Sequence, residues 1–243
     1  MEIEYLLEDF ISMFEYHSSD IGWCERNYVY NSNIVEFWNT ITSLFIILIG
    51  VYGLIRSSKY PANKYYYLLI FIGIFSAYFH ATLSFIGQCL DELSITLIMI
   101  AGNCALYSND KVGLALIFIF VLIQLCIQFV YSEYNRFVLF VYAIFFLNKF
   151  YLMLLSSNKT IRRYASVSAG LFVMGAICWV MDFTFCVRDS PFNFHGMWHI
   201  FVGLMAYCTI ETCVLYQKLN IRDVCTEKCN YKQTHWTNYY EEE

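Results

Sequence analysis

Two histidines four residues apart, His195 and His199, open a long apolar stretch near the end of the chain. On a helix, this spacing places both imidazoles on one face, where they can bind the same metal ion. A third histidine, His80, would complete the ligand set of a catalytic zinc site, in which the fourth tetrahedral position is left to water. Zinc lowers the pKa of its bound water to roughly 7, so these residues predict hydrolytic chemistry.

Two other polar residues fit the same chemistry. Asp91 could orient the water or transfer its proton. Ser76, one helical turn before His80, could donate a hydrogen bond to the oxyanion that forms when a carbonyl is attacked. Each residue also has a simpler interpretation. Histidines at a membrane interface can lie among lipid headgroups, and Ser76 can bond to its own helix backbone. Asp182, which ends another apolar stretch, can act only as a hydrogen-bond acceptor at a helix end.

The composition indicates that these residues belong to a membrane protein. Of the 243 residues, 59% are hydrophobic and 14% are charged, whereas about 25% of the residues in soluble domains are charged. The net charge is −5 and no basic block is present, so we expect no nucleic-acid partner. The apolar stretches predict an all-α fold with seven membrane-spanning helices, at residues 37–56, 65–85, 92–108, 112–131, 137–156, 164–185 and 196–217.

These spans divide the chain into an N-terminal segment (1–36), a seven-helix catalytic domain (37–217) and a tail (218–243). If the N-terminus lies outside, eleven lysines and arginines fall on the inner segments and three on the outer ones. Cytoplasmic loops carry the excess of basic residues. We therefore expect a lumenal or extracellular N-terminus, a cytosolic C-terminus, and all the candidate catalytic residues at the outer ends of their helices.

The N-terminal segment is acidic, with eight carboxylates and one basic residue before the first span. Carboxylate and amide oxygens are ligands that calcium prefers, although the spacing is not that of an EF-hand, and a solvated acidic segment is the alternative. Cys24, Cys89 and Cys186 fall on the outer side, where an oxidising compartment permits a disulfide. Cys225 and Cys229 in the tail could bind a metal together with His235, but free or acylated thiols are the favoured interpretation.

Taken together, the histidines, Ser76, Asp91 and the polar residues before the first span resemble the alkaline ceramidases. This is a family of seven-span zinc amidohydrolases of the endoplasmic reticulum, Golgi and related membranes. The matches follow the order of the family along the chain. They are Trp23–Asn27, Glu36–Thr40, Ser76–His80, Asp91–Leu93, Trp179–Asp182 and His195–His199.

The resemblance implies hydrolysis of ceramide to sphingosine and a fatty acid within the membrane. Ceramide and other membrane sphingolipids would be the partners, with no obligatory protein partner, and the membrane would be that of the endoplasmic reticulum or Golgi. The resemblance also implies roles for individual residues. His80, His195 and His199 would hold Zn²⁺, Asp91 would contact its water, Ser76 would stabilise the oxyanion, and Cys24 would form a disulfide with Cys186.

A lumenal calcium site is also typical of the family, and its ligands would here be Trp23 (through its carbonyl), Glu25, Asn27 and Glu36. Gly22 stands where typical members have an aspartate, so one Ca²⁺ ligand is missing, and Asp20 is the possible substitute.

An alternative function is that of a seven-span receptor resembling the adiponectin and progestin receptor group, which shares a three-histidine zinc site. That group usually has its N-terminus inside the cell. The eleven-to-three distribution of basic residues favours the opposite orientation for this chain.

Overall fold

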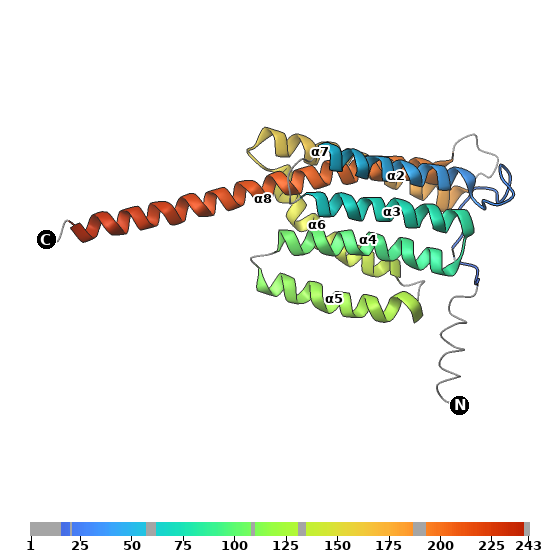
Figure 1. The fold of residues 1–243 in the computed structure, drawn as a ribbon, viewed down its shortest axis with the longest axis horizontal. Coiled ribbons are helices and arrows are strands. Elements are labelled where there is room, and N and C mark those ends of the chain that lie inside the picture. The colour runs from blue at the N-terminus through green and yellow to red at the C-terminus, as the bar shows by residue number, and fades with distance from the viewer. Residues whose placement is uncertain are drawn as a thin grey trace, which may run out of the picture.

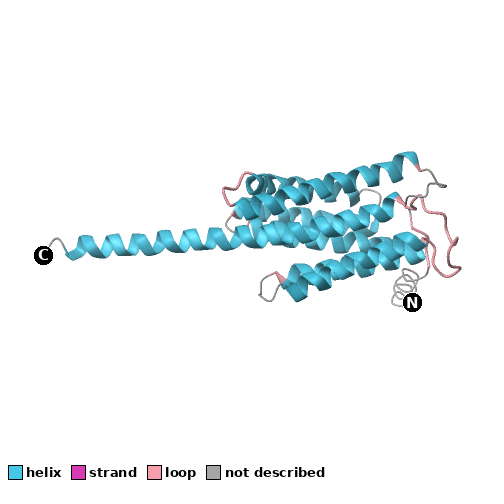
Figure 2. Ribbon diagram, turned by 90° about the horizontal axis from the view of Figure 1, so that it is seen from above, coloured by secondary structure: helices cyan, strands magenta, loops and turns pink. Residues whose placement is uncertain are grey.

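The computed structural model describes residues 16–19, 21–56, 62–107, 110–130, 135–186 and 193–240. Within these residues every secondary-structure element is a helix (Figures 1 and 2). The helices are α2 (Phe37–Arg56), α3 (Asn63–Thr82), α4 (Phe85–Leu106), α5 (Lys111–Val130), α6 (Asn135–Leu154), α7 (Lys159–Val180), the π-helix η2 (Met181–Phe185) and α8 (Phe194–Tyr240).

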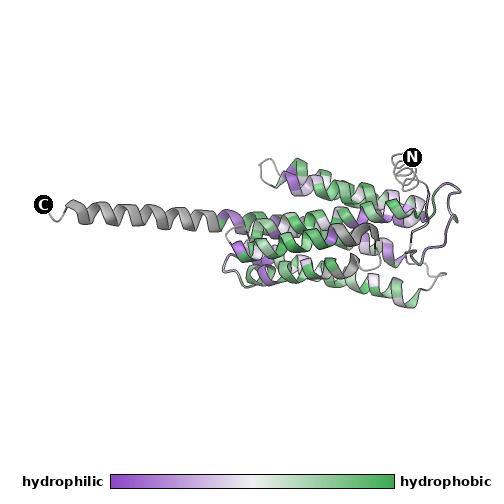
Figure 3. Cartoon of the chain, turned by 90° about the horizontal axis from the view of Figure 1, so that it is seen from below, coloured by the Kyte–Doolittle hydropathy of each residue, from purple (hydrophilic) through white to green (hydrophobic). Residues whose placement is uncertain are grey.

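Five of these helical segments are long and apolar enough to cross a membrane. They are Phe37–Arg56, Asn63–Thr82, Phe85–Leu106, Lys159–Phe185 and Phe194–Leu219. The apolar stretches described in α5 and α6 are shorter. Large apolar side chains such as Leu48, Ile55 and Phe118 face outward from the bundle, and Figure 3 shows hydrophobic residues along the lengths of the helices. This surface fits a lipid environment, because exposed apolar area of this extent is unfavourable in water. The protein is therefore a helical membrane protein.

Most helix boundaries lie within three residues of those expected, but α7 begins at Lys159 rather than at residue 164, and α4 and α8 differ by more. α4 begins at Phe85 rather than at residue 92, because the Ser84 hydroxyl accepts the N–H of Gly87 at 3.1 Å and so caps the helix. Asp91 therefore lies inside α4 rather than at its start. α8 continues to Tyr240, well past the expected end of the last span at residue 217. Figure 1 shows its C-terminal part projecting from the bundle.

α2 and α3 lie unusually close together, and this brings two parts of the site into contact. A Cβ atom at Gly73 would lie 2.8 Å from the main-chain nitrogen of Ile47 and 3.0 Å from the carbonyl oxygen of Ser43. Small residues of this kind allow the backbones of membrane helices to approach. As a result, the first turns of α2 lie beside the last turns of α3, with Ser43 Oγ 3.0 Å from Ser76 Oγ.

The end of α7 changes from α- to π-helical geometry at Met181. Single π-helical turns occur frequently at functional sites. Here the turn contains the buried Asp182, whose carboxylate accepts the main-chain N–H groups of Cys24 at 3.1 Å and His195 at 3.3 Å. Asp182 therefore joins the N-terminal segment to the first turn of α8.

Candidate metal centre

His80 at the end of α3 meets His195 and His199 in the first turns of α8. One ligand nitrogen from each histidine lies within 4.8 Å of the other two, and the ring centroids are 4.6–5.0 Å apart. The three side chains are only 1–4% exposed. Three imidazoles at this separation can coordinate one ion, and imidazole suits zinc. The spatial cluster that the sequence predicts is therefore present.

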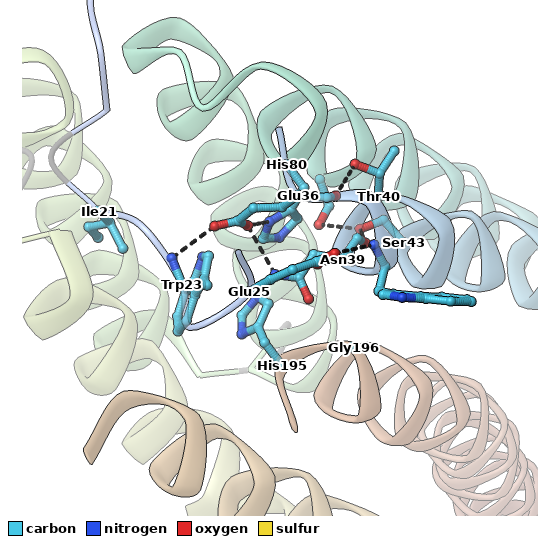
Figure 4. A network of polar contacts seen from close by, with 12 residues as sticks. Ile21, Trp23, Glu25, Glu36, Asn39, Thr40, Ser43, His80, His195 and Gly196 are labelled. Carbon is cyan, nitrogen blue, oxygen red and sulfur yellow. Dashed lines mark hydrogen bonds and ion pairs between the residues drawn. The ribbon is translucent and has the colours of Figure 1, made fainter. Parts of the chain in front are cut away.

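A buried carboxylate orients His80. Its Nδ1 lies 2.7 Å from Oε2 of Glu36, which is itself fully buried (Figure 4). An ionised carboxylate only accepts hydrogen bonds, so Nδ1 carries the proton and Nε2 keeps its lone pair for a metal. A hydrogen bond from the ring nitrogen that does not bind the metal fixes the orientation of a metal-binding histidine. Glu36 is held in turn by the main-chain N–H of Trp23 at 3.0 Å and the side-chain amide of Asn39 at 2.9 Å.

Hydroxyl groups of α2 orient His199 in a similar way. Its Nδ1 lies 2.9 Å from Thr42 Oγ1 and 3.4 Å from Ser43 Oγ. Both hydroxyls also donate to carbonyl groups of their own helix. They therefore accept from Nδ1–H, which leaves Nε2 of His199 available for a metal.

His195 is held by packing rather than by a hydrogen bond to its ring. The indole of Trp23 stacks on the imidazole with a centroid distance of 3.6 Å and an interplanar angle of 21°. Nδ1 of His195 is buried and has no hydrogen-bond partner among the described residues. A buried polar atom without a partner costs free energy, and a bound metal would supply one. This orphaned nitrogen, together with the three-imidazole donor set, fits a metal centre.

The two other predicted catalytic residues lie near these histidines. Asp91 on α4 has a buried Oδ1 with no hydrogen-bond partner in the part of the chain that the structure describes. His80 is one of the ionisable groups that act on its carboxylate electrostatically. Ser76 is buried one turn below His80 and contacts Ser43. Ser76 is therefore linked to His199 through Ser43, and Asp91 lies within electrostatic reach of His80.

The disulfide that the resemblance implies is confirmed. Cys24 and Cys186 are bonded, with their Cα atoms 5.2 Å apart and 162 residues between them in sequence. The bond fastens the N-terminal segment, which carries Trp23, to the end of η2. It lies next to the contact between Cys24 N–H and Asp182.

The residues expected to bind calcium form a hydrogen-bonded network. Oε1 of Glu25 accepts the N–H of Trp38 at 2.7 Å, and Oε2 accepts the N–H of Asn39 at 2.9 Å and the side-chain amide of Asn193 at 3.0 Å. Glu25 thus caps the N-terminus of α2. Burial raises the pKa of Glu25, whereas these hydrogen bonds lower it.

The other predicted calcium ligands are placed differently from one another. The oxygens of Glu36 likewise accept N–H groups, Asn27 is exposed, and Gly22 has no side-chain oxygen. Asp20, the possible substitute ligand, lies outside the described residues. Calcium binding at these residues therefore stays a prediction, with the ligand at position 22 missing.

Sequence reasoning did not identify Thr42 and Ser43 as partners of His199. The available signal was their position three and four residues after Asn39, on the helical face that begins with Glu36. Hydroxyl residues in apolar helices are common packing elements, so this signal is weak.

Comparison with known proteins places this arrangement in a family. The family model described as Ceramidase matches residues 15–240. The chain is 30% identical to alkaline ceramidase 1 of Homo sapiens, with 79% of this chain and 81% of that protein covered. It is 32% identical to the alkaline ceramidase of Drosophila melanogaster, with 79% and 75% covered, and 28% identical to that of Arabidopsis thaliana, with 79% and 81% covered. The chain belongs to the ceramidase family.

Proposed function

We propose that this protein hydrolyses the amide bond of ceramide, releasing sphingosine and a fatty acid, at the three-histidine centre. The observation that carries the proposal is the cluster of His80, His195 and His199, buried at one end of a bundle of membrane-spanning helices. The relatives that cover most of the chain are named alkaline ceramidases.

Zinc is the metal we assign to the centre, because three neutral imidazoles with one remaining coordination position are typical of catalytic zinc. When bound, zinc supplies a Lewis acid and an activated water nucleophile. The protein contributes the orientation of the ligands. Glu36 fixes His80, Thr42 and Ser43 fix His199, and Trp23 packs against the ring of His195.

Asp91 moves the proton in this proposal. Its Oδ1 takes a proton from the attacking water and passes it to the amide nitrogen as the carbon–nitrogen bond breaks, so that sphingosine leaves as a free amine. The unpartnered Oδ1 in the structure supports this role, because no protein donor competes for it among the described residues.

Ser76 stabilises the negative charge on the carbonyl oxygen. Ser43 Oγ already donates to the carbonyl of Asn39, so Ser76 is the donor in the 3.0 Å contact between the two hydroxyls. In this proposal the Ser76 hydrogen turns from Ser43 to the substrate oxygen, and a donor held at this place stabilises the tetrahedral intermediate of acyl transfer.

We also propose that all seven helices α2 to α8 cross the membrane, that residues 1–36 are lumenal and that the tail from residue 218 is cytosolic. The eleven-to-three distribution of basic residues supports this orientation. It places the histidines near the lumenal surface, close to the depth of the amide group of ceramide. We assign the protein to the membrane of the endoplasmic reticulum or Golgi because of the resemblance to that family.

The test is a product analysis with purified protein in detergent. Ceramide should yield sphingosine and fatty acid in equal amounts, and His195→Ala should abolish both while leaving expression near normal. Equal turnover by wild type and His195→Ala, or no release from any ceramide by zinc-loaded wild type, would overturn the proposal.

A further inference from the structure

A cavity of about 320 Å³ lies within the bundle, below the histidine cluster. Residues of α3, α4, α6, α7 and α8 line it, among them Met99, Phe146, Phe150 and Met205. On α8, the lining runs from Met205 to Cys213, that is, six to fourteen residues after His199. At about 1.5 Å per helical residue, this stretch lies about 9–21 Å from His199 along the helix. On α8 the cavity therefore begins about 9 Å beyond His199 and continues deeper into the bilayer, within reach of a chain whose amide group lies at the histidine cluster.

The cavity borders the lipid between α6 and α7. Leu147 on α6 is 53% exposed, and Phe172 and Val173 on α7 are 46% and 55% exposed, yet all three line the cavity. A chain that already lies in the bilayer can enter sideways at this position without passing through water.

The chemistry of the walls suits a hydrocarbon chain. Almost all lining side chains are apolar, and the hydroxyls of Ser168 and Thr209 lie 2.6 Å apart and bond to each other. That pair is satisfied, and the hydroxyl of Tyr65, the other hydroxyl-bearing residue of the described lining, bonds to the side chain of Gln217. The hydroxyls of the lining therefore do not require a polar ligand.

Gly102 of α4 leaves part of this space open. A Cβ atom built there would meet nothing closer than Cε2 of Phe146, at 4.0 Å. Gly102 is also part of the lining, so a larger side chain would extend into the cavity instead of into a neighbouring helix.

We propose that the cavity holds one hydrocarbon chain of the lipid substrate, and that Gly102 determines how long this chain can be. The inference rests on the proposed function, because the chain must be attached to an amide group at the histidine cluster. A leucine at this position would fill the space of about four chain carbons, and further carbons would then meet a closed wall.

The test compares Gly102→Leu with Gly170→Leu. Gly170 lies on α7 next to the cavity residue Ala169, but it is exposed and has no atom within 4 Å of an added Cβ. Both variants introduce the same residue into an apolar helix at a position with room for it. Turnover is measured on two series of ceramides. In one the acyl chain has graded length and the sphingoid base is fixed, and in the other the base is graded and the acyl chain is fixed.

We expect Gly102→Leu to shift the preferred length in one series by about four carbons and to lower kcat/KM for longer chains by about tenfold or more. Gly170→Leu should match wild type. The series that shifts identifies the chain that occupies the cavity. Unchanged profiles in both series for a folded Gly102→Leu variant would overturn the inference.

A binding readout separates this inference from the proposed function. Fatty acids and sphingoid bases of graded length compete with a fluorescent fatty acid for the purified protein. Gly102→Leu should bind the longer members of one class more weakly than wild type and Gly170→Leu do, even if no variant hydrolyses ceramide. If wild type hydrolyses nothing but the binding profile shifts, the proposed function fails and the cavity assignment stands. If the binding profile does not shift, the assignment fails.

Discussion

Oε2 of Glu36 lies 2.7 Å from Nδ1 of His80, and both side chains are almost fully buried. This contact joins the start of α2 to the metal centre at the end of α3. Because the same carboxylate accepts the main-chain N–H of Trp23, it also links His80 to the segment that packs on His195. The geometry of the histidine cluster therefore depends on residues that precede the first helix.

Glu36→Gln should weaken zinc binding. Loss of the charged acceptor leaves His80 less firmly oriented, and contacts of this kind are typically worth about 10- to 100-fold in metal affinity or activity. Titration with a competing chelator measures the affinity. Glu211→Gln is the matched control, since Glu211 contacts Tyr66 in the other half of the bundle. Equal zinc affinity of Glu36→Gln and wild type would contradict the positioning role.

Asp91→Asn should separate metal binding from catalysis. Asparagine keeps the size of the side chain but cannot accept the proton, so we expect kcat to fall by about 10²–10⁴-fold. The zinc content should stay at the wild-type level, because Asp91 is not one of the three clustered ligands. Single-turnover rates and metal analysis on the same preparation test both parts. A variant that loses its zinc would assign Asp91 to metal binding instead.

The disulfide between Cys24 and Cys186 should stabilise the end of the bundle that carries the histidine cluster. Disulfides that close long loops typically contribute about 2–4 kcal/mol. We expect reductant to lower the Tm of wild type and of Cys178→Ser, whose thiol is free. The Cys24→Ser/Cys186→Ser double variant should start at the lower value and not respond. Equal responses of all three proteins would show that the bond contributes nothing to stability.

Gly22→Asp should create a response to calcium that wild type lacks. Gly22 has open space around it and no positive φ, so an aspartate fits without strain and adds a carboxylate next to Trp23, whose N–H bonds to Glu36. Thermal unfolding with and without calcium is the measurement, and Gly22→Asn controls for the substitution itself. A strong stabilisation of wild type by calcium would contradict the hydrogen-bonded interpretation of this segment.

Much of the site could be predicted because two of its ligands lie one helical turn apart and the third lies at the same depth in another span. The spacing of His195 and His199, together with the matching depth of His80 in its own span, is enough to predict the cluster from the sequence. Thr42 and Ser43 could not be found in this way, since a hydroxyl in an apolar helix reveals its partner only when the neighbouring helix is placed.

The helices were also largely predictable, with the largest errors at two ends. Asp91 and Glu92 mark a polarity boundary, but Ser84 caps α4 earlier, so hydropathy and helix geometry disagree there. At residue 217 the apolar run ends while α8 continues. The cavity was beyond prediction, because it depends on how the faces of α4, α6, α7 and α8 meet.

The most direct test of the central claim is to measure zinc content and ceramide hydrolysis on the same purified samples of wild type and His199→Ala. We predict that wild type contains one equivalent of zinc, loses turnover on chelation and regains it when zinc is returned. His199→Ala should hold little zinc and release no fatty acid. Undiminished hydrolysis by zinc-free wild type, or by His199→Ala, would contradict the account.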